Sequence, residues 1–260
     1  MSSPLIVERR GKVLEVTINR PKANAIDAPT SRIMGETFAK FRDDPELRVA
    51  ILTGAGEKFF CPGWDLKAAA EGEAPDADYG VGGFGGLQEL PGLNKPVIAA
   101  VNGIAFGGGF EIMISADIII AADHATFALP EINSGTLADA ATIKLPRRIP
   151  YHVAMELLFT GRRMDAHEAR QWGIVNEIVT QPNLMIRARE VAAMLADGPP
   201  LVFAAIKEVV RETAHLPIQQ AFDLVTRRKL KSVDVLYSSE DQKEGARAFA
   251  EKRKPVWKGR

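Results

Sequence analysis

The chain contains little cysteine and no long apolar segment. A single cysteine, Cys61, among 260 residues excludes a disulfide within the chain. No window approaches eighteen uninterrupted apolar residues, and the first residues lack the apolar core of a secretion signal. We therefore expect no membrane span and a cytoplasmic protein.

The chain also lacks an excess of charge of either sign. It has 33 basic and 33 acidic residues, a formal net charge of zero, and no basic block. Because a nucleic-acid-binding surface needs clustered positive charge, nucleic acid is not an expected partner. The histidines are scattered without metal-ligand spacing, so we expect no metal site. They are His124, His152, His167 and His215.

The most informative feature present is a glycine run at residues 107–109, between an expected strand and an expected helix. Without Cβ atoms the backbone can approach a ligand closely, and the first amides of a helix have no internal partner. These amides also lie at the positive end of the helix dipole, so the geometry suits a developing oxyanion. Taken alone, such a run is more often a plain strand-to-helix turn than a ligand site.

Two glutamates accompany the glycine run. Glu111 lies three residues after Gly108, on the same helical face, and Glu131 follows after one expected strand. A pair of carboxyl groups beside an oxyanion site, one acting as base and one as acid, can add or remove water next to a carbonyl. Either glutamate alone is more often a surface charge or a helix-start carboxylate.

Two further turns suggest a ligand site. The segment 59–67 contains Gly63 and can offer the Trp64 amide as a second donor to an oxyanion. The turn at 19–26 has basic residues and exposed backbone that suit a phosphate-bearing ligand. Cys61, in the first of these turns, is expected to be a small buried apolar residue.

Hydrophobic periodicity predicts an α/β core followed by helices, and the 46% hydrophobic content is enough to fill such a core. The expected strands are 5–8, 13–19, 49–53, 97–101, 117–122 and one near 174–179. The expected helices are 29–42, 151–160, 165–172, 184–195, 201–212, 218–231 and 240–252. We expect a core over residues 1–195 and a helical region over 196–260.

Taken together, these segments resemble the crotonase (enoyl-CoA hydratase/isomerase) superfamily over essentially the whole chain. The shared motifs are Asn19-Arg20-Pro21 with Asn24-Ala25, the Gly63 turn, 96–111, Pro130-Glu131, Thr160-Gly161-Arg162 with 166–169, 173–176, and the tail from Ser239 to Lys252. Residues 21–28, 63–78 and 255–260 are most similar to the carnitinyl-CoA dehydratase (crotonobetainyl-CoA hydratase) subfamily. The resemblance implies a spiral of ββα units followed by a C-terminal helical trimerisation region.

The resemblance also implies a reaction, the reversible hydration of a short-chain 2-enoyl-CoA thioester such as crotonobetainyl-CoA. The amides of Trp64 and Gly108 hold the enolate oxygen, Glu111 holds and deprotonates water, and Glu131 exchanges the α-proton. Coenzyme A enters as part of the substrate, so no separate cofactor is expected. We expect repulsion and partial burial to push the two carboxyl pKa values apart, with Glu111 favoured as the anion by its helix N-terminus.

The coenzyme A contacts implied by the resemblance are spread over the chain. Lys58 and Lys67 approach the phosphates, while the adenine and pantetheine path is lined by Lys22, Ala23 and Ala25. Phe249 and Lys252 match positions that reach the adenine pocket of a neighbouring subunit, and the family forms trimers that stack into hexamers. Otherwise each lysine is a solvated surface charge and Phe249 an ordinary core residue.

The sequence departs from the family pattern over residues 132–142. Ala138 stands in place of a proline and Ala141-Thr142 in place of a Gly-Gly pair, so this loop is expected to run differently near the acyl end. Asp139 in the loop either pairs with a cationic acyl group or caps a helix beginning at Ala140.

Aromatic side chains are available for the same cation. Trp64, Tyr79 and Phe84 can make cation–π contacts with a trimethylammonium group, or Tyr79 and Phe84 can simply anchor a mobile lid. Two other functions stay open. One is an enoyl-CoA isomerase that uses a single carboxylate, and the other is a CoA-thioester-binding protein with little activity.

Overall fold

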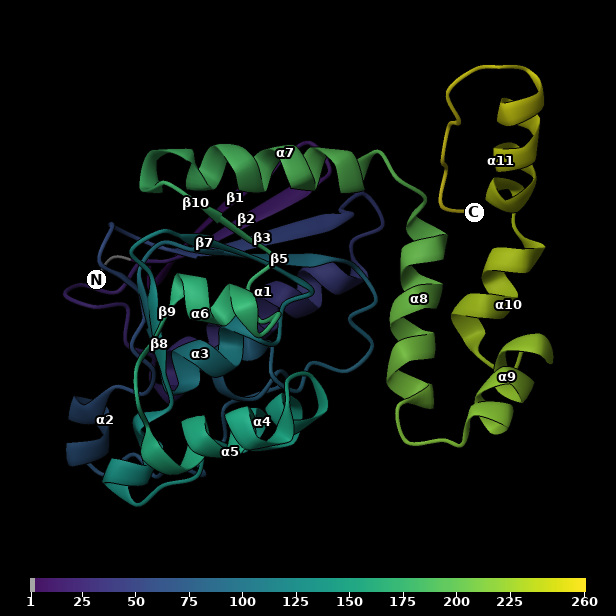
Figure 1. Cartoon of the computed structure of the whole chain (residues 1–260). Coiled ribbons are helices and arrows are strands. Elements are labelled where there is room, and N and C mark those ends of the chain that lie inside the picture. The colour runs from purple at the N-terminus through teal and green to yellow at the C-terminus, as the bar shows by residue number, and fades with distance from the viewer. Residues whose placement is uncertain (1–2) are drawn as a thin grey trace.

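Two sheets of different size form the centre of the molecule in the computed structural model, which describes residues 3–260. The wide sheet has the strand order β1-β2-β3-β5-β7-β10 (Figure 1). The narrow sheet has the order β4-β6-β8-β9. The wide-sheet strands are β1 Leu5–Arg10, β2 Val13–Ile18, β3 Val49–Gly54, β5 Val97–Val101, β7 Ile118–Ala122 and β10 Glu177–Val179. The narrow-sheet strands are β4 Phe59–Cys61, β6 Ile104–Phe106, β8 Thr126–Ala128 and β9 Met164–Asp165.

The chain passes repeatedly from the wide sheet to the narrow one. β3 leads into β4, β5 into β6 and β7 into β8, and neighbouring strands are parallel apart from the antiparallel pairs β1–β2 and β8–β9. This succession confirms the predicted spiral of ββα units. The helices of this part are α1 Ala28–Asp43, α2 Leu66–Ala70, α3 Gly108–Met113, α4 Asp139–Lys144, α5 Tyr151–Thr160, α6 Ala166–Gln171 and α7 Leu184–Ala196. Single 3₁₀ turns are η1 Phe84–Gly86, η2 Pro130–Ser134, η3 Leu145–Arg147 and η4 Gln181–Asn183.

Alternate residues of the central strands face opposite sides of the wide sheet. Ile51 and Ile98 are fully buried in the layer formed with α7, whereas Leu52 and Ala99 are buried in the larger cluster that includes α1 and α3. Figure 1 shows α7 on one face of the sheet and α1 and α3 on the other. Strands covered on both faces are apolar throughout, which is why the sequence shows them as continuous apolar runs.

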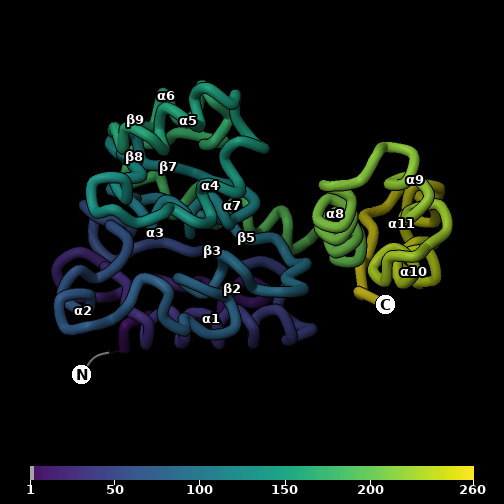
Figure 2. The backbone as a smooth tube through the Cα atoms, turned by 90° about the horizontal axis from the view of Figure 1, so that it is seen from below, coloured from purple at the N-terminus to yellow at the C-terminus, as the bar shows by residue number. Residues whose placement is uncertain are grey.

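The last four helices stand beside the sheets as a separate lobe (Figure 2). They are α8 Pro200–Thr213, α9 Ile218–Thr226, α10 Lys231–Ser238 and α11 Glu240–Ala250. The lobe has only a small buried cluster, formed by Ala205, Leu230 and Val233, and an ion pair of 2.7 Å joins Lys207 to Asp117 beside the wide sheet. Large apolar side chains of the lobe stay exposed: Ile206, Val210, Ile218, Phe222, Val235, Tyr237 and Phe249.

The prediction of one helix over 218–231 is wrong. The structure ends α9 at Thr226 and begins α10 at Lys231, with Arg228 between them at a positive φ of 49°. Arginine and lysine are good helix formers, so the basic residues at the break give no local signal of it. No helix within residues 3–260 is both long enough and apolar enough to cross a membrane.

The narrow sheet was largely missed by the sequence patterns. One strand was expected between Glu111 and Glu131, but both β7 and β8 lie there, and the predicted turn 59–67 contains β4 and the start of α2. Each strand of the narrow sheet has three residues or fewer. Such segments are too short to display the period-two alternation that identifies a strand.

Candidate active site

A cavity of about 720 Å³ lies where the ends of several elements meet. It is lined by Trp64 before α2, Phe84 of η1, Glu111 of α3, Glu131 of η2 and Asp139 of α4. Gly108, at the start of α3, lines it as well. The fold therefore brings together the four residues that the sequence selected as catalytic, although Trp64 and Glu131 are 67 positions apart along the chain.

Two backbone amides beside this cavity are free to bind a ligand. Ile26 donates to the Gly63 carbonyl at 2.9 Å and accepts from the Asp65 amide at 2.8 Å, a pattern that leaves the intervening Trp64 N–H unpaired. The Gly108 N–H begins α3 and has no intrahelical acceptor. Within residues 3–260 neither amide donates a hydrogen bond.

The turn that carries Trp64 lies directly against the start of α3. Gly63 has a φ of 98°, and a Cβ there would lie 2.9 Å from the Phe106 carbonyl oxygen and 3.0 Å from the Gly108 nitrogen. A Cβ on Gly108 would overlap the Phe84 ring. Glycine at both places lets the turn that carries Trp64 lie in contact with the start of α3.

Buried asparagines hold the connection between β3 and β4. The Asn24 and Asn102 side chains both donate to the Phe59 carbonyl, at 2.9 and 3.1 Å. Asn102 also accepts from the Gly54 amide at 3.0 Å. The asparagines of two sequence motifs therefore act on the backbone that leads to Trp64, which fixes where its amide lies.

Glu111 is buried and doubly hydrogen-bonded. Only 6% of the residue is exposed, its Oε1 accepts from the Ala141 amide at 2.9 Å, and its Oε2 accepts from Gln88 Nε2 at 3.3 Å. Burial raises the pKa of Glu111, and these two donors act in the opposite direction because they stabilise the anion.

Glu131 faces the same cavity with less support. Its Oε2 is buried and has no hydrogen-bond partner within residues 3–260. Burial raises the pKa of Glu131 to about 7, and the negative charges of Glu111 and Asp139 raise it as well. A carboxyl group with this pKa exchanges a proton near neutral pH, as a general acid or base must.

The expectation for the two carboxyl groups needs correction. We expected Glu111 to be kept anionic by the N-terminus of its own helix, yet its pKa is raised by burial and its donors come from α4 and from Gln88. Glu111 is still the better supported anion of the pair. The support comes from the unusual loop at 132–142, whose Ala141 amide is at the start of α4.

Asp139 is the first residue of α4 rather than its cap. Ala138 occupies the N-cap position, and no side chain caps this helix. The alternative of a helix-capping role through a side-chain hydrogen bond is therefore wrong. The Asp139 carboxylate instead lines the cavity, where it raises the pKa of both catalytic candidates.

Aromatic side chains form one wall of the cavity. The rings of Tyr79 and Phe84 meet edge to face with centroids 5.3 Å apart, and both line the cavity together with Trp64. Trp64 Nε1 donates to Glu73 at 2.6 Å, and the same carboxylate accepts from the Ala28 amide at 2.9 Å. Glu73 thus ties the segment after α2 to the start of α1 and holds the indole in place.

The family model described as Enoyl-CoA hydratase/isomerase matches residues 8–260. The chain belongs to the enoyl-CoA hydratase/isomerase family. It is 58% identical to the carnitinyl-CoA dehydratase of Citrobacter koseri and 57% identical to that of Escherichia coli K12, over 100% of both chains in each case. The enoyl-CoA hydratase of Mycobacterium tuberculosis H37Rv superposes with a TM-score of 0.89 at 38% identity, covering 99% of each chain. That of Bacillus anthracis gives 0.89 at 32% identity, covering 99% of this chain and 100% of the other.

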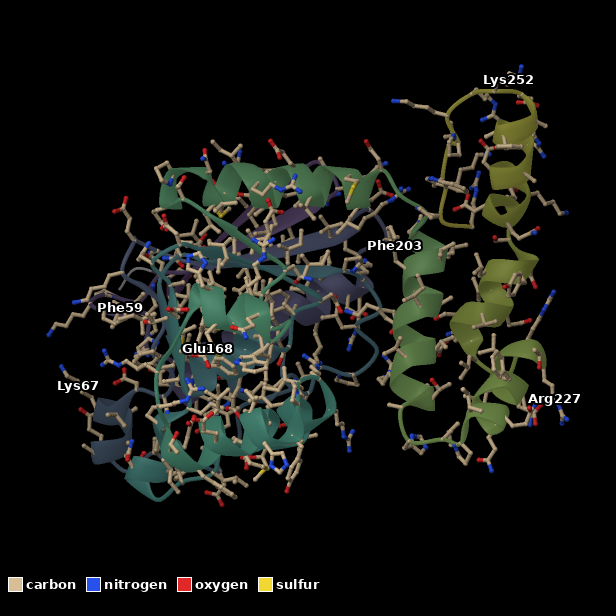
Figure 3. All side chains as sticks on the ribbon, in the orientation of Figure 1. Phe59, Lys67, Glu168, Phe203, Arg227 and Lys252 are labelled. Atoms are coloured by element: carbon tan, nitrogen blue, oxygen red, sulfur yellow. The ribbon has the colours of Figure 1, made fainter. Side chains whose placement is uncertain are left out.

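The residues predicted from the enoyl-CoA hydratase/isomerase resemblance to contact coenzyme A do not lie together on the cavity, as Glu111 and Glu131 do. Lys22, Lys58 and Lys67 are exposed, but Arg20 in the same turn is bound to Asp27 at 2.6 Å and is not free for phosphate. Figure 3 shows Lys67 and Lys252 on opposite sides of the molecule. The partly buried Ala23 and Ala25 lie in the Asn24 turn, and Phe249 is 87% exposed rather than packed in a core. The binding roles of these residues stay predictions.

Two polar cavity residues close to Glu111 were not selected from the sequence. Gln88 and Lys144 both line the cavity and both contact the surroundings of Glu111. Gln88 follows η1 in a segment without regular structure, and Lys144 ends a six-residue helix. Neither belongs to a motif, so no signal in a single sequence distinguishes them from ordinary surface residues.

Proposed function

We propose that this protein catalyses the reversible hydration of a short-chain 2-enoyl-CoA thioester, with crotonobetainyl-CoA and carnitinyl-CoA as its substrate pair. The observation that carries the proposal is the placement of Glu111 and Glu131 on one cavity with the free amides of Trp64 and Gly108. The full-length similarity to carnitinyl-CoA dehydratases supports the choice of acyl group.

Hydration begins when water attacks the β-carbon and Glu111 takes a proton from it. The electron pair of the double bond moves toward the thioester, so that negative charge collects on the carbonyl oxygen as an enolate. The Trp64 and Gly108 amides donate to this oxygen, and removal of one such donor typically costs about 2.7–4 kcal/mol of transition-state stabilisation. Glu131 then gives its proton to the α-carbon, and the enolate returns to the thioester.

The two carboxyl groups together carry one proton at the start of the reaction and one at its end, and both are protonated while the enolate is present. Hydration starts with the proton on Glu131 and ends with it on Glu111, and dehydration follows the reverse course. The singly protonated pair is therefore the active form in both directions. The hydrogen bonds to Glu111 and the missing partner of Glu131 Oε2 favour the arrangement that hydration needs.

The acyl end of the cavity suits a positively charged group. Asp139 supplies a negative charge near the two glutamates, and the Tyr79 and Phe84 rings supply faces for cation–π contacts, each worth roughly 0.5–2 kcal/mol. A trimethylammonium group can be held by both. Neutral short-chain acyl groups lack this attraction, so we propose selectivity for the cationic substrate.

The remainder of the proposal concerns coenzyme A and assembly. Lys22, Lys58 and Lys67 would approach the phosphates and adenine from this chain, and Phe249 and Lys252 would do so from a neighbouring copy. The exposed apolar side chains of the helical lobe support an assembly of several copies, because large apolar patches on a soluble protein favour association. We propose a homotrimer or a hexamer.

Two other functions predict different behaviour. An isomerase that moves a double bond needs only one carboxyl group, and it leaves unexplained why Glu111 is held by two donors. If the loop at 132–142 prevents catalysis, the chain would instead be a CoA-thioester-binding protein with little activity. Both alternatives predict little or no hydration of a conjugated thioester.

One assay tests the proposed function. The purified protein is mixed with crotonyl-CoA or crotonobetainyl-CoA, and loss of the absorbance of the conjugated thioester is followed. We expect loss with both substrates and a higher kcat/KM for the cationic one. Tight binding of either thioester without any loss of absorbance would instead support the binding protein.

A further inference from the structure

Glu111 is held by two donors of different kinds. The Ala141 amide is fixed by the backbone of α4, whereas the other donor is the side chain of Gln88. An amide oxygen would be repelled by a carboxylate, so the Gln88 NH₂ group is the part that faces Glu111. Within residues 3–260, Gln88 is the only side chain that donates to this carboxylate.

A closed set of hydrogen bonds fixes Gln88 relative to Glu111. Lys144 Nζ donates to the Gln88 backbone carbonyl at 3.2 Å and to Ser115 Oγ at 2.6 Å. Ser115 Oγ in turn donates to the Glu111 backbone carbonyl at 2.7 Å. Lys144 therefore ties the backbone that carries Gln88 to the end of the helix that carries Glu111.

We propose that Gln88, anchored by Lys144, is a positioning residue that orients the Glu111 carboxylate toward water and keeps the shared proton on Glu131. The inference rests on the proposed hydratase function. It adds the group that decides which of the two glutamates is the base in the hydration direction.

The physical reason is the difference in hydrogen bonding between the two carboxyl groups. A donor stabilises the ionised form of the carboxyl group that it contacts, and loss of the donor makes that group easier to protonate. Without Gln88, part of the population would carry the proton on Glu111, which cannot then accept a proton from water. Hydration would slow without any change in how the thioester is bound.

Other charges near Glu111 also affect its pKa. They determine in which direction each control variant should move the acid limb of the pH profile. Glu131 of η2 and Asp139 of α4 are negative neighbours, and Lys144 of α4 is positive. Glu89, beside Gln88, also acts on Lys144. Loss of the negative charge of Asp139 should make both glutamates harder to protonate, which is opposite to the effect expected at Gln88.

The test compares Gln88→Met with wild type and with Gln171→Met, which makes the same change at an exposed position of α6. For Gln88→Met we expect kcat for hydration of crotonyl-CoA to fall about 10-fold or more, with KM changed less than threefold. The acid limb of the kcat/KM profile should move to higher pH by roughly half a unit or more. Gln171→Met should match wild type, and Asp139→Asn should move the acid limb to lower pH.

Lys144→Met provides a second variant if Gln88→Met does not fold. It leaves the Gln88 amide intact but releases its backbone and removes a positive charge beside Glu111, and both changes should move the acid limb in the same direction. A lower kcat with an unmoved pH profile in both variants would overturn the inference, because loss of fold alone reduces the active fraction without shifting the profile. A raised KM with unchanged kcat would do the same, since Gln88 would then be a substrate contact.

The outcome is distinguishable from failure of the proposed function. If Glu111→Gln hydrates crotonyl-CoA at the wild-type rate, Glu111 is not the base and the proposed mechanism fails first. If Glu111→Gln is inactive while the Gln88 variants keep the wild-type profile, only the role of Gln88 is overturned.

Discussion

The two sides of the cavity differ in the hydrogen bonds that they donate to a buried carboxyl group. On the α3–α4 side, Glu111 is 6% exposed and accepts hydrogen bonds from Ala141 and Gln88. On the η2 side, a buried oxygen of Glu131 has no partner within the described residues. A buried acceptor without a partner is costly as an anion but much less so when protonated.

This difference separates two similar side chains into two chemical roles. The side with donors can keep a negative charge and so can accept a proton from water. The side without them raises the pKa of Glu131 to about 7 and so can release or take up a proton near neutral pH.

The largest expected effect comes from replacing either carboxyl group. Glu111→Gln and Glu131→Gln should each lower kcat for hydration roughly 10²–10⁴-fold, because an amide keeps the shape but cannot transfer the proton. Affinity for a CoA ester should change only a few-fold. The measurement is turnover of crotonyl-CoA together with a binding titration.

Glu36→Gln is a matched control for this prediction, since Glu36 is exposed on α1. It should leave turnover unchanged. Wild-type turnover in either active-site variant would remove the distinction between the two sides. Equal loss of turnover and of CoA-ester affinity would show that the variant damages the cavity rather than the proton transfer.

The residues on the two sides differ in how far the sequence could identify them. Glu111, Glu131, Trp64 and Gly108 belong to recognisable glycine turns and family motifs, and the fold indeed places them on one cavity. The donor from Gln88 could not be predicted, because it depends on how the irregular segment after η1 packs against α3. Motifs record which residues take part, whereas hydrogen-bond partners depend on distances that only the folded chain sets.

The overall fold shows the same division. The apolar strands β3, β5 and β7 were predicted within a residue or so at each end, since both of their faces are buried. The strands of the narrow sheet were mostly not predicted, because three residues carry too little periodicity. The break at Arg228 was missed since its neighbours favour helix as much as turn.

The next largest effect concerns Asp139, the charge shared by both sides of the cavity. Asp139→Asn should lower kcat/KM for crotonobetainyl-CoA by roughly 5- to 30-fold relative to crotonyl-CoA, because a partly screened ion pair is lost only with the cationic substrate. Loss of this charge also lowers the pKa of Glu131, which affects both substrates alike. The ratio of the two kcat/KM values is therefore the quantity to measure, and an unchanged ratio would remove Asp139 as the cation partner.

A smaller effect is expected from pH alone. Because the singly protonated pair is active in both directions, kcat/KM for hydration and for dehydration should both fall as the pH rises through about 7, where Glu131 loses its proton. Above that point the decrease should approach tenfold per pH unit. Parallel profiles in the two directions are required. A profile that stays flat from pH 6 to 9 would contradict the raised pKa of Glu131.

The smallest expected effect is on the free energy of unfolding. It reports on Glu131, on the η2 side, and its measurement needs no substrate. Burial raises the pKa of Glu131 to about 7 from an ordinary value of 4.5, so between these pH values the folded chain binds more protons than the unfolded one. The free energy of unfolding must then decrease as the pH rises through this window. Glu131→Gln removes the titrating group and should flatten the decrease by about 1–3 kcal/mol between pH 5 and 7. Urea unfolding at one protein concentration, with Glu36→Gln as control, measures the free energy of unfolding at each pH. If this free energy depends on pH equally in wild type and in Glu131→Gln, then Glu131 is no harder to ionise in the folded chain than in water.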